Sequence, residues 1–396
     1  MKKILKCFTI IFSVSLLLLF SFNLYAAEKP YKIGVNLGLT GFLSEINQYI
    51  KKAMVMEVER VNKMGGINGH PMELIFLDNG LDVSRGAANM MKFARNPEVL
   101  AVVGPLFDAI QMATRSISEK QKIVSIVICP SNPIVRKAKY KWSFNIAQSD
   151  ILVASKMVDL AKAHGYKNLL VFRAENPIAL GIAQQIKNVG QKENMHVIIA
   201  PQTHKSTDID MTPQLIQMKP VIKKEKVDVM MLSTEGPPGA VICKNMKALG
   251  IKLPRIGTHA FGFAPTISIG GEAMEGVEFP AGKTIVPYQL DKDDPAREVI
   301  QAFDKRMKAR YGIGADQLSG HGYDIVWILA NALKRCKNNV NRKRLRDEIE
   351  NTKGFVGCTG IYNYSPDDHD GLSKTDFVFV RIENGKYKRI KFPELK

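Results

Sequence analysis

Asp108 lies where a short apolar run, LAVVGPLF, gives way to a stretch with helical spacing, DAIQMA. A carboxylate at such a junction has three possible roles. With Gln111 three residues later it forms a pattern typical of a capping box, which satisfies free N–H groups of the first helical turn. It could instead contact a ligand, where its charge would repel a carboxylate and favour a hydroxyl, amide or cation. A third possibility is that it turns away and pairs with an arginine or lysine.

Polar residues recur at the other predicted strand ends. They include Ser131 and Asn132 in the first half of the chain, and Thr234, Glu235, Thr258 and His259 in the second half. In open α/β sheets, ligands bind where strands end and helices begin, because free helix N–H groups attract polar groups there. Glu235 precedes GPPG and could cap a helix instead of binding a ligand. His259 could pair with a ligand acid or form a hydrogen bond as a neutral ring. It could also lie at the rim of the cleft without contacting a ligand.

Patterns typical of enzymes are missing from the sequence. Gly34, Gly38 and Gly41 do not match GxGxxG, no GxSxG or CxxC occurs, and the seven histidines are scattered. We therefore expect no catalytic residue, cofactor or metal, and an enzyme is the weaker alternative.

The elements that position these residues alternate between strand and helix. A buried strand at 32–37 is followed by an amphipathic helix from Ser44, and the same alternation restarts after Phe144. Such βαβ succession predicts an α/β fold with parallel sheets and helices on both faces. Two successive units of this kind predict two similar lobes, with chain crossings near 145, 280 and 358.

The first 27 residues are typical of a secretory signal peptide. Lys2, Lys3 and Lys6 precede an apolar run over 8–20, and small residues follow at Ala26 and Ala27. We therefore expect export, most simply to a bacterial periplasm. The formal net charge of +18 could indicate a protein that binds nucleic acid. Export and the lack of a motif that combines aromatic and basic residues favour a solvated, lysine-rich surface instead. Attraction to acidic membranes is the alternative. The densest basic stretch, 334–346, fits a helix end and the start of the next helix.

Four cysteines follow the predicted signal peptide: Cys129, Cys243, Cys336 and Cys358. In an oxidising compartment, Cys336 and Cys358 could close a modest loop between a helix end and the next strand. We take this pair as a possible disulfide.

Several motifs follow one another along the chain: GLTGFLSE, MGGINGHPMELIFLD, AVVGP, SNP, GEAMEGVEF and FVGCTGIYNY. Their order resembles the periplasmic Leu/Ile/Val-binding-protein family, the solute-binding components of ABC importers. The resemblance implies a type I periplasmic binding protein fold, with two Rossmann-like lobes joined by a three-crossover hinge. We expect the first lobe to comprise 28–145 and 281–357, and the second lobe to comprise 146–280 and 358–396.

The resemblance also assigns candidate ligand-binding positions. The serine and threonine that hold an amino-acid carboxylate in the family fall on Asp108 and near Ser131, and the acid that holds the ammonium falls on His259. Family aromatic positions fall on Ile46, Leu180 and near Glu235. Phe107 and Asn132 complete the candidate set. The altered charges at Asp108 and His259 argue against a plain α-amino acid, so the expected solute is amino-acid-like, an amide or an organic acid.

The function implied by the resemblance is binding without reaction. A small solute enters the cleft, the lobes close, and the membrane permease of an ABC importer receives it. We expect a monomer with no nucleic-acid partner. The alternative is a sensory protein that presents its solute to a membrane receptor.

Overall fold

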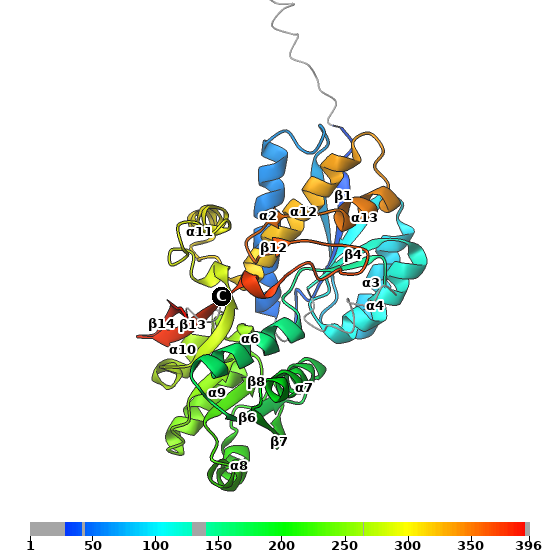
Figure 1. Cartoon of the computed structure of the whole chain (residues 1–396). Coiled ribbons are helices and arrows are strands. Elements are labelled where there is room, and N and C mark those ends of the chain that lie inside the picture. The colour runs from blue at the N-terminus through cyan, green and yellow to red at the C-terminus, as the bar shows by residue number, and fades with distance from the viewer. Residues whose placement is uncertain (1–27, 42–43, 129–139, 264, 393–396) are drawn as a thin grey trace, which may run out of the picture.

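Two parallel sheets, each with helices on both faces, form two lobes in the computed structural model (Figure 1). The structure describes residues 28–392 apart from 42–43, 129–139 and 264. The predicted signal peptide, Cys129, Ser131 and Asn132 therefore lie outside the described residues. The expected α/β class with two parallel-sheet lobes is confirmed.

The first sheet has the strand order β2-β1-β3-β4-β5, and all its pairings are parallel. Its strands are β1 (Tyr31–Leu37), β2 (Met72–Asp78), β3 (Val99–Val103), β4 (Val124–Val127) and β5 (Ser143–Asn145). Side chains alternate across this sheet. Val102 packs with Phe93 of α3, whereas Ala101 and Val103 belong to the core under α2.

Helices from both ends of the chain cover this sheet, as the blue, cyan and orange ribbons show (Figure 1). They are α2 (Ser44–Lys63), α3 (Val83–Arg95), α4 (Asp108–Gln121), α12 (Gln317–Cys336) and α13 (Arg342–Glu350). Met54 and Val58 of α2 and Ile325 of α12 join the same buried cluster. The late helix α12 thus belongs with the first half of the chain.

The second sheet has the order β14-β13-β10-β9-β8-β6-β7. Its strands are β6 (Asn168–Ala174), β7 (His196–His204), β8 (Val229–Ser233), β9 (Arg255–Gly257), β10 (Glu278–Gly282), β13 (Phe377–Glu383) and β14 (Lys386–Ile390). The first five of these strands are parallel, and the predicted C-terminal hairpin adds β13 and β14 as antiparallel strands. Asn384 and Gly385 at its turn both have positive φ, as a tight hairpin turn requires.

Two pairs of helices cover opposite faces of the second sheet. Leu169 and Val171 pack in the cluster of α6 and α7, while Leu170 and Phe172 pack in the cluster of α8 and α9. The helices from α6 to α11 are α6 (Asp150–Ala163), α7 (Pro177–Lys192), α8 (Thr212–Lys224), α9 (Gly236–Ala248), α10 (Pro265–Gly270) and α11 (Arg297–Tyr311). A separate two-stranded sheet joins β11 (Phe355–Val356) to β12 (Ile361–Tyr362).

The chain passes between the lobes three times, after β5, after β10 and between α13 and β13. Thr284 of the second passage donates to the carbonyl of Cys358 in the third over 2.7 Å, so these passages lie side by side. Because β10 runs to Gly282 within the second sheet, the second passage begins after that residue. The residues at which we divide the lobes stay a prediction.

The proposed bridge between Cys336 and Cys358 is wrong, since both thiols are free and buried. The backbone N–H of Cys358 donates to Asp324, which lies twelve residues before Cys336 on α12. At 1.5 Å per residue, that separation is about 18 Å along the helix. A disulfide requires Cα atoms within about 7 Å.

Candidate functional site

A cavity of about 120 Å³ lies between the lobes and is lined by residues of both. The first lobe contributes Ile46, Leu106, Phe107, Ile128, Gln317, Leu318 and His321, and the second contributes Asn176, Ile178, Ile182, Thr234, Glu235, Thr258, His259 and Phe263. The predicted residues Ile46, Phe107, Glu235 and His259 are all brought together here. Whether they contact a solute stays a prediction.

The sheets position the polar side of this cavity. Asn176 follows β6, Glu235 follows β8, and His259 follows β9 at the start of the short 3-10 helix η1 (His259–Gly262). These three strands are neighbours in one parallel sheet, so their carboxyl ends meet at one edge. The expectation that strand ends converge on the cleft is confirmed for the second lobe.

Apolar side chains form most of the cavity wall. Ile46 and Leu318 approach from the helices of the first lobe, Ile178 and Ile182 from α7, and Phe263 from the segment after η1. Burying apolar ligand surface against such walls contributes about 25 cal/mol per Å². The site therefore suits a solute with an apolar body.

Glu235 is held by three donors of the second lobe. Its Oε1 accepts from Asn176 Nδ2 at 2.7 Å and from Ser206 Oγ at 3.2 Å, and its Oε2 accepts from Thr234 Oγ1 at 3.2 Å. Glu235 occupies the N-cap position of α9 but its side chain makes no capping hydrogen bond to that helix. Asn176, in contrast, caps α7 by accepting from the N–H of Ala179 at 2.8 Å.

Two buried imidazoles, His259 and His321, face the cavity from opposite lobes. His259 is 8% exposed and His321 is 2% exposed. Burial lowers the pKa of His259 to about 4; burial and the neighbouring His259 lower the pKa of His321 to about 3. Both rings are therefore neutral near pH 7. Among the described residues, neither Nδ1 atom has a hydrogen-bond partner.

The predicted capping box at Asp108 is wrong. The N-cap of α4 is Phe107, whose carbonyl accepts from the N–H of Gln111 at 3.0 Å, and Asp108 occupies the first helical position. From that position its carboxylate still interacts favourably with the positive end of the helix dipole. Asp108 is 8% exposed and lies beside Phe107, outside the described lining of the cavity.

Leu180, a predicted ligand-binding residue, lies outside the described lining of the cavity. Its side chain is 49% exposed. On α7 the cavity is lined by Ile178, Ala179 and Ile182 instead, because residues three or four apart share a helix face and Leu180 falls on another.

Several lining residues were missed, above all Gln317 and His321. Both belong to α12, which lies far along the chain from the strand ends on which the site prediction depends. The available signal was a buried histidine within an apolar helical pattern, which is more often a core residue than a binding residue. Thr234 and Thr258 follow strands, as predicted, and Asn176 follows β6, but none of the three is in the candidate set.

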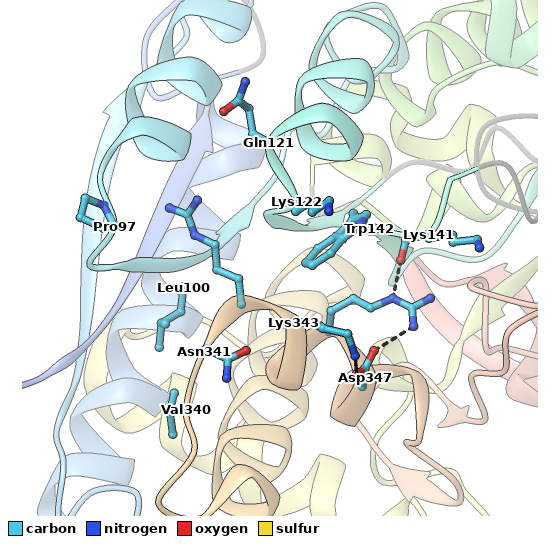
Figure 2. A pocket seen from close by; sticks show the side chains of 12 residues that line it. Pro97, Leu100, Gln121, Lys122, Lys141, Trp142, Val340, Asn341, Lys343 and Asp347 are labelled. Atoms are coloured by element: carbon cyan, nitrogen blue, oxygen red, sulfur yellow. Dashed lines mark hydrogen bonds and ion pairs between the residues drawn. The ribbon is translucent and has the colours of Figure 1, made fainter.

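A larger hollow of about 780 Å³ lies on the first lobe beside α13 (Figure 2). The basic side chains that α13 contributes to it are engaged within the protein. Arg342 donates to the carbonyls of Val99 and Asn96, and Lys343 pairs with Asp347 at 2.8 Å. The basic stretch 334–346 thus spans the end of α12 and the start of α13, as predicted. These cations hold α13 in place, so the smaller interlobe cavity is the candidate site.

In the described ranges, no three metal-binding side chains come together. Within the same part of the chain, no helix combines the length and apolar composition needed to span a membrane.

Comparison with known proteins gives a family and a set of relatives. Residues 30–386 match the family model described as periplasmic binding protein. A leucine-, isoleucine-, valine-, threonine- and alanine-binding protein of Pseudomonas aeruginosa is 22% identical over 355 residues, covering 89% of this chain and 90% of that protein. The Leu/Ile/Val-binding protein of Escherichia coli is 20% identical over 290 residues, covering 70% and 77%.

Solved structures share the fold. An extracellular ligand-binding receptor from Rhodopseudomonas palustris HaA2 superposes with a TM-score of 0.81 at 19% identity, covering 92% of this chain and 100% of that one. A leucine-binding protein from Thermotoga maritima gives a TM-score of 0.75 at 22% identity, covering 92% and 99%. The two-lobed type I fold expected from the sequence is therefore confirmed.

Proposed function

Because the chain belongs to the periplasmic binding protein family, a family of solute-binding proteins rather than enzymes, we propose that it captures a small organic solute between its lobes and delivers it to the permease of an ABC importer. The observation that carries this proposal is the cavity lined by both lobes, with polar residues at the ends of three adjacent strands. A solute that contacts both walls stabilises the closed arrangement by its differential affinity for it. The predicted signal peptide supports a periplasmic location.

The solute class follows from the cavity wall and from the relatives. The P. aeruginosa and E. coli relatives are both named for leucine, isoleucine and valine, and the former also for threonine and alanine, which supports a ligand of amino-acid size. Here Ile46, Ile178, Ile182 and Phe263 require an apolar body. We propose an amino-acid-like compound, amide or organic acid with an apolar side chain. A micromolar affinity needs about 8 kcal/mol, which a few hydrogen bonds and this apolar contact can supply.

Thermal unfolding of the refolded, ligand-free protein tests the proposal. A panel of aliphatic amino acids, amides, apolar carboxylic acids, polyamines and polyols is added at millimolar concentration. We expect one of the first three classes to raise the midpoint by several degrees, because a ligand that binds only the folded state stabilises it by about 2.7 kcal/mol at one hundred times its Kd. No shift with any of those three classes contradicts the proposal.

A further inference from the structure

The spare hydrogen-bonding capacity of the interlobe cavity is concentrated in two imidazoles. His321 comes from α12 of the first lobe and His259 from η1 of the second. Each ring is more than nine-tenths buried, and each leaves Nδ1 without a partner among the described residues. A buried nitrogen without a partner costs free energy that a ligand group can recover. Since the rings approach from opposite lobes, one ligand group between them would contact both lobes.

Other polar side chains of the cavity are already engaged within the protein. Glu235 accepts from three donors of its own lobe. The amide of Gln317 accepts from the N–H of Gly282 and donates to Gln148, and the hydroxyl of Thr258 donates to the carbonyl of Thr234 at 2.9 Å. A ligand ammonium would thus compete with three donors for Glu235, the single carboxylate of the described lining, whereas a ligand acid meets two imidazoles whose Nδ1 atoms have no partner there.

Building on the proposed function, we propose that His259 and His321 together receive the acid group of a ligand that has an apolar body and no ammonium, and that the site takes up one proton from solvent as this anion binds. A lone carboxylate buried between apolar walls is strongly unfavourable unless its charge is neutralised. One proton, held on an imidazole or on the ligand acid, cancels the charge that the ligand carboxylate brings into the cavity. The proton count is one in either case.

The other titratable groups described around the cavity bind protein groups or lie outside its lining, so we assign proton uptake to the histidine pair. Glu235 of α9 is bound as described, and Asp108 of α4 lies outside the cavity lining. Asp316, the N-cap of α12, accepts from the N–H of Ser319 at 2.8 Å, and Tyr387 of β14 donates to the carbonyl of Phe261 at 2.9 Å.

The sign of the pH dependence follows from the empty and occupied states. In the empty cavity, burial holds the pKa of both rings well below neutrality. A carboxylate between them raises the pKa of the ring it contacts. The complex then holds a proton that the separate partners lack, so affinity rises as the pH falls. Where one full proton is taken up, the Kd increases about tenfold for each pH unit gained.

Isothermal titration calorimetry with a matched ligand pair tests the inference. Leucine and 4-methylpentanoate share one carbon skeleton and differ in the ammonium group, and phenylalanine and 3-phenylpropanoate form a second pair of the same kind. Each compound is titrated at pH 7, 7.5 and 8 in phosphate and in Tris, whose different ionisation enthalpies report the protons exchanged. We expect an acid without ammonium to bind at least tenfold tighter than its amino acid, with about one proton taken up.

Variants locate the proton. His259→Gln and His321→Gln keep a polar side chain of similar length but cannot carry the charge, so we expect at least tenfold weaker binding of the acid and loss of the pH dependence. His196→Gln is the control, since His196 is exposed and pairs with Glu225 at the far end of the second sheet. If the buried His321 variant does not fold, the His259 variant and the wild-type proton count decide the question.

The outcomes separate this inference from the proposed function. Binding of leucine or phenylalanine in preference to the matched acids, with no proton uptake, overturns the inference and leaves solute binding intact. Binding of an acid without proton uptake also overturns it. If neither pair binds and no compound of the wider panel stabilises the protein, both the inference and the proposed function fall.

Discussion

Nε2 of Gln317 lies 2.9 Å from Oε1 of Gln148, and this hydrogen bond joins α12 to the first passage between the lobes. Both side chains are buried. Gln317 also accepts from the N–H of Gly282 at 3.4 Å, and Gln148 donates to the carbonyl of Thr359 at 3.3 Å. The glutamine pair therefore connects the first passage to the third passage and to the end of β10, where the second passage begins, beside the cavity that Gln317 helps to line.

Replacing Gln317 by methionine tests the importance of this pair. Gln317→Met leaves the amide oxygen of Gln148 and the N–H of Gly282 without their partner in a buried site. We expect the free energy of unfolding to fall by about 2 kcal/mol, measured from urea denaturation. Gln184→Met is the control, because Gln184 is exposed and bonds only its helical neighbour Asn188, and it should change stability by less than about 0.5 kcal/mol. Equal urea midpoints for the two variants would contradict the role of the pair.

Asp324 gives a prediction about pH. Burial raises the pKa of this carboxyl to about 7, although the N–H groups of Cys358 and Thr359 and the hydroxyl of Tyr362 donate to it and oppose the rise. The folded protein then keeps a proton that the unfolded chain releases from about pH 4 upward. The free energy of unfolding should fall as the pH rises from about 4 to 7 and should level off above that range.

The comparison with Asp324→Asn isolates this contribution, because asparagine does not titrate. Urea denaturation of both proteins at pH 4.5, 5.5, 6.5 and 7.5 should show the wild type losing more stability than the variant up to pH 7. The difference should approach a slope of about 1.4 kcal/mol per pH unit. Parallel curves would show that the donors to Asp324, which also include the hydroxyl of Thr359, keep it ionised in the folded state throughout.

Glu57 of α2 forms a buried junction with two other helices. Its carboxylate accepts from Arg306 of α11 at 3.0 Å and from the indole N–H of Trp327 of α12 at 2.8 Å. Glu57→Gln removes the charge and leaves Arg306 without its counterion, so we expect a loss of about 3 kcal/mol. Glu59→Gln is the matched control two residues away, where an exposed pair with Arg310 should contribute about 1 kcal/mol or less. Thermal and urea unfolding of both variants measure the contrast, and similar losses would contradict it.

The sequence predicts the parts of the site that follow from local pattern. His259 and Glu235 directly follow buried strands of one parallel sheet, and the geometry of such a sheet brings their positions together at its carboxyl edge. Phe107 reaches the cavity for the same reason in the first lobe. The fold was predictable because strand and helix periodicities alternate along nearly the whole chain.

Other parts of the site depend on tertiary packing that no local pattern encodes. His321 and Gln317 reach the cavity because α12 packs against α2 across more than 250 residues of sequence. The helical register decides whether Ile178 or Leu180 points inward, and an alignment at low identity cannot fix it to one residue. The helix at Asp108 begins one position earlier than its capping pattern requires, because the backbone of Phe107 takes the N-cap role.

The two faces of α7 allow a direct test of the site. Ile178 lines the cavity, whereas Leu180 is 49% exposed two residues later. Ile178→Trp places a larger side chain against a space of about 120 Å³, so we expect it to occupy the volume a solute needs and to weaken binding at least one-hundredfold. Leu180→Trp makes the same kind of change on the outward face and should leave binding within about twofold. Calorimetric titration with the compound that gives the largest thermal shift measures both variants, and circular dichroism confirms that each is folded. Equal affinities in the two variants would show that the solute binds elsewhere than in this cavity.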